Sequence, residues 1–115
     1  MSTRPAIWPG GTRVVGLLWD AIHDAAANER AARVHIEYQV QKRDGDPSPA
    51  HTVAAMLGLR PANVRQIDRR TRARLGELVT ASERYRTLRR LDWFDWLDAR
   101  PDARPDAGLD GGRAA

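Results

Sequence analysis

The chain has 115 residues, a formal net charge of +4 and no cysteine. This length is enough for one small domain and too short for two well-formed hydrophobic cores. The lack of cysteine excludes disulfides and thiolate metal sites. No apolar run approaches the roughly 20 residues that a membrane-spanning helix needs, so we expect a cytoplasmic protein with no membrane contact.

Positive charge is carried by 18 arginines and one lysine, and it is segregated along the chain. Residues 60–90 hold ten arginines and three acids, whereas residues 91–115 hold six aspartates and three arginines. Such segregation suggests a surface for a polyanion such as nucleic acid, followed by an acidic end.

The N-terminal third is predicted to be helical after an irregular arm at 1–11 that is rich in Pro and Gly. Apolar residues recur at helical spacing from Thr12 to about Ala27. Asp20, His23 and Asp24 share another face of this helix. We interpret them as a solvated polar face, because further convergent ligands for a metal are lacking.

The next segment carries two conflicting signals. Asn28 is a good N-cap for a helix. The apolar residues that follow alternate strictly with polar ones, which is typical of a half-buried strand: Val34, Ile36, Tyr38 and Val40. We favour a helix because a comparable second strand is lacking and an unpaired strand is not stable. A strand that pairs across two chains is the alternative.

Residues 48–78 predict two helices joined by a tight turn. Ser48 can cap a helix that opens with Pro49. Gly58 is suited to end that helix in a left-handed conformation, and Pro61 to open the next one. The second helix has an apolar face opposite a basic face that contains Arg65, Gln66, Arg69 and Arg72. Together they predict a helix-turn-helix at about residues 49–75.

An arginine-rich face is often only solvated, so the pattern alone leaves DNA binding about as plausible as a plain surface. Six arginines from Arg60 to Arg74 stand against one acid, Asp68. Solvated helices usually mix both signs of charge, so this imbalance favours a polyanionic partner.

The stretch VAAMLGLRPANVRQIDRRTRARL, from Val53 to Leu75, resembles region 4 of bacterial sigma factors of the housekeeping type. The similarity extends upstream to Asn28 and covers about fifty residues, with Val64-Arg65-Gln66-Ile67 as its most specific part. The resemblance implies a helix over residues 33–41. It also implies that Arg65 and Gln66 take part in reading a promoter −35 element, and that RNA polymerase is a candidate partner.

This chain departs from the sigma pattern in two ways. Pro61 and Ala62 stand where the family commonly has a basic residue and an acidic base-reading residue. No stretch is a candidate for the separate sigma domain that holds the core polymerase. The resemblance therefore predicts a stand-alone region 4-like domain at 12–80, with an altered sequence preference.

Roles in DNA binding follow from the position of each side chain on the second helix, whose early part enters the major groove. The predicted base contacts are Arg65, Gln66, Ala62 and Arg69. Arginine pairs with guanine, glutamine with adenine, and alanine contacts only a thymine methyl. The predicted phosphate contacts are Arg60, Arg70, Arg72, Ser48 and Thr52.

The last predicted helix, residues 81–99, is amphipathic and rich in aromatic side chains. One interpretation is that it closes the hydrophobic core. The other is a docking surface for a protein partner, formed by Trp93, Phe94, Trp96 and Leu97. A disordered tail is predicted at 100–115 from its content of Pro, Asp, Gly and Ala.

The sequence thus predicts an all-α domain of four or five helices that contains a helix-turn-helix. The expected function is that of a small bacterial or phage transcription regulator that binds double-stranded DNA, as a monomer or a homodimer. The alternative is a protein-binding adaptor that docks on RNA polymerase or another regulator. No catalytic constellation, cofactor site or metal site stands out, so an enzyme is not expected.

Overall fold

The computed structural model describes residues 12–98, which form five α-helices and no strand, so the predicted all-α fold is confirmed. The α-helices are α1 (Thr12–Ala25), α2 (Glu29–Arg43), α3 (Pro49–Leu57), α4 (Pro61–Ala81) and α5 (Asp95–Asp98). Two 3₁₀ helices, η1 (Arg86–Arg90) and η2 (Asp92–Phe94), precede α5. The arm predicted at 1–11 and the tail predicted at 100–115 lie outside the described residues.

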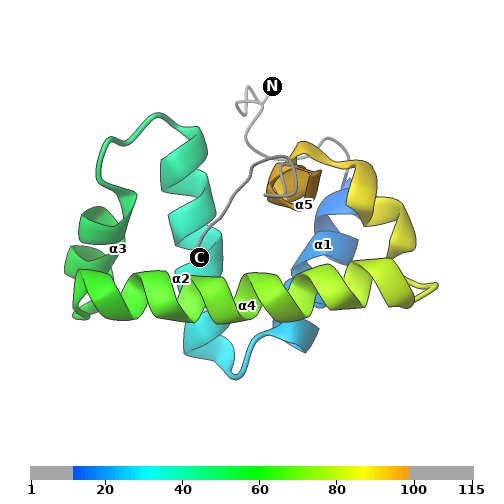
Figure 1. Ribbon diagram of the computed structural model, residues 1–115, viewed down its shortest axis with the longest axis horizontal. Coiled ribbons are helices and arrows are strands. Elements are labelled where there is room, and N and C mark those ends of the chain that lie inside the picture. The colour runs from blue at the N-terminus through cyan, green and yellow to red at the C-terminus, as the bar shows by residue number, and fades with distance from the viewer. Residues whose placement is uncertain (1–11, 99–115) are drawn as a thin grey trace, which may run out of the picture.

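Helix α4 is the element against which the other long helices pack, and it runs across the full width of the molecule (Figure 1). Its 21 residues correspond to about 30 Å of helix. Its first half packs with α2 and α3 around one apolar cluster, centred on Val34, Val53 and Val64. Its second half packs with α1 and the C-terminal segment around a larger cluster that includes Leu75 and Val79.

Helix α2 lies between these two clusters, and this position explains the alternation that resembles a strand. Residues two apart on a helix lie on nearly opposite faces, whereas residues four apart share one face. Val34 and Tyr38 accordingly belong to the cluster shared with α3, and Ile36 and Val40 to the cluster shared with α1. The prediction of a helix is confirmed, and the alternative of a strand at 33–41 is wrong.

The predicted helix-turn-helix is present as α3, a three-residue turn at 58–60, and α4. Gly58 ends α3 in the left-handed region at φ 69° and ψ 39°, as its position predicted. Pro49 and Pro61 occupy the starts of α3 and α4, where a missing N–H removes no helical hydrogen bond.

Of the two predicted N-caps, one is confirmed and one is wrong. The Asn28 side chain accepts a hydrogen bond from the Ala31 amide, 2.8 Å away. The Ser48 side chain makes no such bond. Asp46, two residues upstream, instead accepts from the Ser48 amide and from the Thr52 hydroxyl at the start of α3. Both bonds lower the pKa of Asp46.

The single amphipathic helix predicted at 81–99 is wrong: Ser82 and Leu91 have extended backbone, and only short helical turns lie between and after them. A continuous helix would spread Tyr85, Leu88, Trp93 and Phe94 around about two thirds of its circumference. The extended breaks turn all four into the core, where each is at most 2% exposed.

The polar face of α1 holds this C-terminal segment in place. The Tyr85 hydroxyl donates to Asp24, and Arg84 donates to Asp20 at 3.1 Å. The face predicted to be merely solvated therefore has intramolecular partners. Burial, followed by the hydrogen bond to Asp24, raises the pKa of Tyr85 above its ordinary value.

Replacing Gly58 by Ala is expected to destabilise the domain by about 1–2 kcal/mol, since its left-handed conformation is strained for any residue with a Cβ. Gly16→Ala is the matched control. Gly16 lies inside α1 with open space around the added methyl, so this change should stabilise by about 0.5–1 kcal/mol. Urea unfolding of both variants measures the difference, and equal effects would contradict the turn geometry.

Ionisation of Tyr85 is expected to weaken folding at alkaline pH. Its pKa is raised in the folded state, so the unfolded chain ionises first and the folded state loses stability as pH rises above about 10. Urea unfolding between pH 8 and 11 should show a loss that is smaller in Tyr85→Phe. Tyr38→Phe, at the other tyrosine, is the control and should keep the wild-type pH profile.

Candidate nucleic-acid interface

The four residues predicted to contact bases all lie exposed on the first three turns of α4: Ala62, Arg65, Gln66 and Arg69. They are brought to one side because Val64, Asp68 and Thr71 occupy the opposite, buried side of the helix. Arg60 and Arg70, predicted as phosphate contacts, are also exposed. This part of the predicted site is thus accessible on one helix surface.

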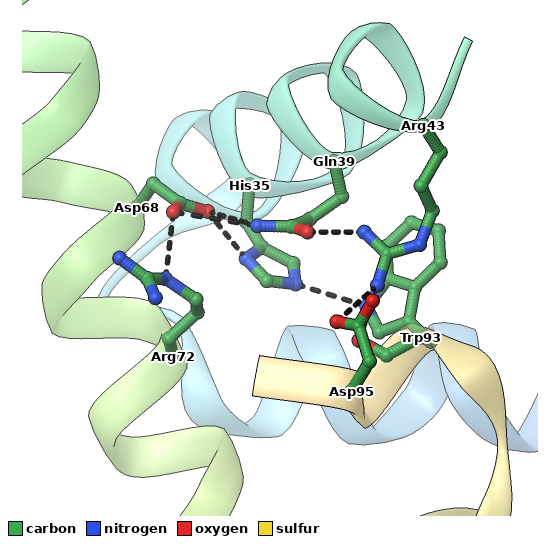
Figure 2. A network of polar contacts seen from close by, with 7 residues as sticks. All are labelled: His35, Gln39, Arg43, Asp68, Arg72, Trp93 and Asp95. Atoms are coloured by element: carbon green, nitrogen blue, oxygen red, sulfur yellow. Dashed lines mark hydrogen bonds and ion pairs between the residues drawn. The ribbon is translucent and has the colours of Figure 1, made fainter. Parts of the chain in front are cut away.

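Asp68, the one acid among the arginines of this helix, points inward and is fully buried (Figure 2). Three donors surround its carboxylate. His35 Nδ1 lies 2.8 Å from Oδ1, Arg72 Nε lies 2.8 Å from Oδ2, and Gln39 Nε2 lies 3.2 Å from Oδ1. A buried charge needs such partners because its transfer from water is otherwise very costly.

The network continues from His35 to the C-terminal segment. Trp93 Nε1 donates to His35 Nε2 at 3.1 Å, so His35 carries its proton on Nδ1 and donates it to Asp68. On the other side of the network, Arg43 donates to Gln39 (Figure 2). It also donates to the backbone carbonyls of Asp92 and Trp93. The network thereby joins α2, α4 and the C-terminal segment at the junction of the two apolar clusters.

This inward orientation of Asp68 decides the charge of the outer surface of α4. From Arg60 to Arg74, every charged side chain that is classed as exposed is an arginine. An uninterrupted positive surface attracts a polyanion more strongly than a mixed one. The burial of one carboxylate therefore strengthens the feature on which DNA binding was predicted.

Arg72 was predicted to contact phosphate, and the structure gives it another role. Its Nε pairs with Asp68 and its guanidinium lies 5.8 Å from the centre of the Trp96 ring. The residue is half-buried because it lies one turn after Asp68, on the side where the C-terminal segment crosses α4. We therefore remove Arg72 from the set of candidate phosphate contacts.

Ser48 and Thr52 are likewise poor candidates for phosphate contact. The Ser48 amide and the Thr52 hydroxyl both donate to Asp46. The Asp46 carboxylate is ionised at neutral pH, as aspartate ordinarily is, and the bonds from Thr52 and Ser48 lower its pKa further. A negative charge beside these donors opposes a phosphate. The start of α3 is consequently a less suitable phosphate site than the arginines of α4.

The predicted docking surface is only partly exposed. Trp93 and Phe94 are core residues, at 2% and 0% exposure, so their assignment to a docking surface is wrong in this conformation. Trp96 and Leu97 are half-buried and lie against Gly76 of α4. Gly76 permits this approach, since a Cβ there would lie 3.1 Å from Leu97 Cδ2. The interpretation in which this segment closes the core agrees with the burial.

Sequence reasoning missed His35, Gln39 and Arg43 as partners of the helix-turn-helix. On α2, the signal that could have identified them is their spacing of four residues, which places them on one side of the helix. On α4, the signal is Asp68, a single acid among arginines. Histidine and aspartate also form catalytic pairs, but here both are fully buried and His35 Nε2 is occupied by the Trp93 indole. The pair therefore has the geometry of a structural network.

No group of three or more His, Cys, Asp or Glu side chains in residues 12–98 converges as metal ligands would. Within the same range, no helix combines the length and apolarity needed to cross a membrane. Comparisons with family models, curated proteins and solved structures found no match to this chain.

Replacing Asp68 by Asn is expected to cost about 3–5 kcal/mol of stability, the usual effect of breaking a buried ionic network. Asparagine offers one acceptor oxygen to three donors and adds two hydrogens of its own. Glu77→Gln, which alters an exposed acid of the same helix, should change stability by less than about 0.5 kcal/mol. Urea unfolding compares the two.

If Asp68→Asn does not fold, Trp93→Phe tests the same network more gently. It leaves His35 Nε2 without its donor and also removes part of a buried ring, at a cost of at least about 1–3 kcal/mol. Wild-type stability in both variants would contradict a stabilising role for the network.

Proposed function

We propose that this protein is a small DNA-binding regulator of transcription that presents the first three turns of α4 to the major groove of double-stranded DNA. The supporting observation is the surface from Arg60 to Arg74, on which every exposed charge is positive while the single acid is buried and paired. In a helix-turn-helix, the helix that follows the turn enters the major groove, and α4 has that position here.

Within this proposal, some of the exposed residues contact base edges and others contact phosphates. Arg65 bonds guanine O6 and N7, and Gln66 bonds adenine N6 and N7, each contributing roughly 1–3 kcal/mol of discrimination. Arg69 lies one turn after Arg65 on the same side and reads a neighbouring base. Ala62 contributes contact with a thymine methyl, and Arg60 and Arg70 bind phosphates.

The resemblance to sigma region 4 supports the same site and adds RNA polymerase as a candidate second partner in the cytoplasm of a bacterial or phage-infected cell. The alternative of a protein-binding adaptor has less support. Two of its four expected contact residues, Trp93 and Phe94, are buried. We therefore place DNA binding first.

Arg65→Ala is expected to relax sequence preference at one base pair, whereas Arg60→Ala should weaken binding to all sequences and reduce the salt slope by about 1. The reason is that a base contact carries sequence information and a phosphate contact carries only charge. Selection from a random pool of duplexes, followed by salt titration of binding, measures both effects.

Arg86→Ala, an exposed arginine of η1 at the other end of α4, is the matched control and should bind DNA as the wild type does. Undetectable binding of the wild-type protein to any duplex at low salt would refute the proposal. So would equal losses in the three arginine variants, since they would indicate only a general effect of charge.

A further inference from the structure

A pocket of about 260 Å³ lies between the α1–α2 connection and α4. Arginines line it from two helices: Arg30 of α2, and Arg70 and Arg74 of α4. No acidic residue lines it. Asp68, the nearest acid along α4, is buried and paired with His35 and Arg72, and Glu29 and Glu77 are exposed and outside the lining.

The two arginines from α4 are available to a ligand. In the described part of the chain, no hydrogen bond or ion pair engages Arg70 or Arg74, which are one turn apart. Arg30 is partly engaged, with one long contact of 3.4 Å to the Leu57 carbonyl oxygen. Two guanidinium groups four residues apart on a helix are near enough to hold one anionic group together.

The rest of the lining is mainly apolar, with alanines from α1 and α2 and Ile67 from α4. Thr71, which is 2% exposed, also lines the pocket and adds a polar side chain to the wall that carries the two arginines. An apolar pocket with a few convergent polar groups is the usual form of a small-molecule site. A bare inorganic anion would leave the apolar wall without a partner.

This pocket lies on a different side of α4 from the candidate base contacts. Ile67, Thr71 and Arg74 follow one another at spacings of four and three residues, and so share one helix side. That side lies well over 90° around the helix from Arg65 and Arg69, at about 100° of rotation for each residue. The pocket is therefore separate from the proposed base contacts, although Arg70 is both a lining residue and a proposed phosphate contact.

We infer that this pocket binds a small organic acid, whose carboxylate is held by Arg70 and Arg74 and whose apolar body packs against Ala31 and Ile67. The pocket is slightly below the range of about 300–1,000 Å³ that drug-sized ligands occupy, which suits a ligand with one small ring or a short chain. Arginine is suited to the carboxylate because its planar fork binds both oxygens.

Titration of the full chain with benzoate, followed by two-dimensional amide NMR in the absence of DNA, tests this site independently of the proposed DNA binding. Benzoate is expected to shift the amides of Ala31, Ile67 and Thr71 with a dissociation constant of about 1 mM. The neutral analogue benzamide should leave them unchanged at the same concentrations. Inorganic phosphate should bind more weakly than benzoate.

Arg74→Gln should weaken benzoate binding roughly tenfold, as the loss of a charge-assisted hydrogen bond does. Arg86→Gln, an exposed arginine outside the pocket, should leave it unchanged, and thermal unfolding checks that both variants fold. The inference would be overturned if benzoate did not shift these amides, or if benzamide or phosphate bound as tightly as benzoate. Equal losses of benzoate affinity in the two variants would also overturn it.

Discussion

The fold depends on how one buried carboxylate, Asp68, is neutralised. It lies where two apolar clusters meet, and donors from α2 and α4 converge on it: His35, Gln39 and Arg72. The indole of Trp93 then fixes the imidazole from the far side. A network that requires every partner in place is costly when incomplete. It therefore specifies one register of α2, α4 and the C-terminal segment, which apolar packing alone would leave less defined.

The same network links stability to the proposed function. Because Asp68 and Arg72 pair beneath the surface, the exposed part of α4 keeps arginines without an opposing acid. The C-terminal segment then covers the second half of this helix, where Gly76 admits Leu97 and Trp96. The exposed first half is the surface that we propose binds DNA. Arg74 and Arg70, the latter also a proposed phosphate contact, line a pocket on another side of α4, so the arginines of one helix face two different surfaces.

Much of the fold was predictable from local signals, because each acts within a few residues. Gly58, the two prolines and Asn28 mark helix ends through backbone geometry and one short hydrogen bond. The exposure of Arg65, Gln66 and Arg69 follows from the apolar period of the same helix. Ser48 was the exception, since its side chain makes no capping bond and Asp46 binds the Ser48 amide and the Thr52 hydroxyl from a position that no simple capping rule marks.

The sequence by itself determined the helical class, the helix-turn-helix and the basic face of α4, because periodicity, glycine and proline act locally. Only the tertiary structure decided which polar residues are buried. Whether Arg72 faces a phosphate or Asp68, and whether Trp93 meets a partner or His35, depends on contacts between residues some 4 to 58 positions apart. The alternation in α2 has the same cause: two opposite buried faces arise only when neighbours pack on both sides of one helix.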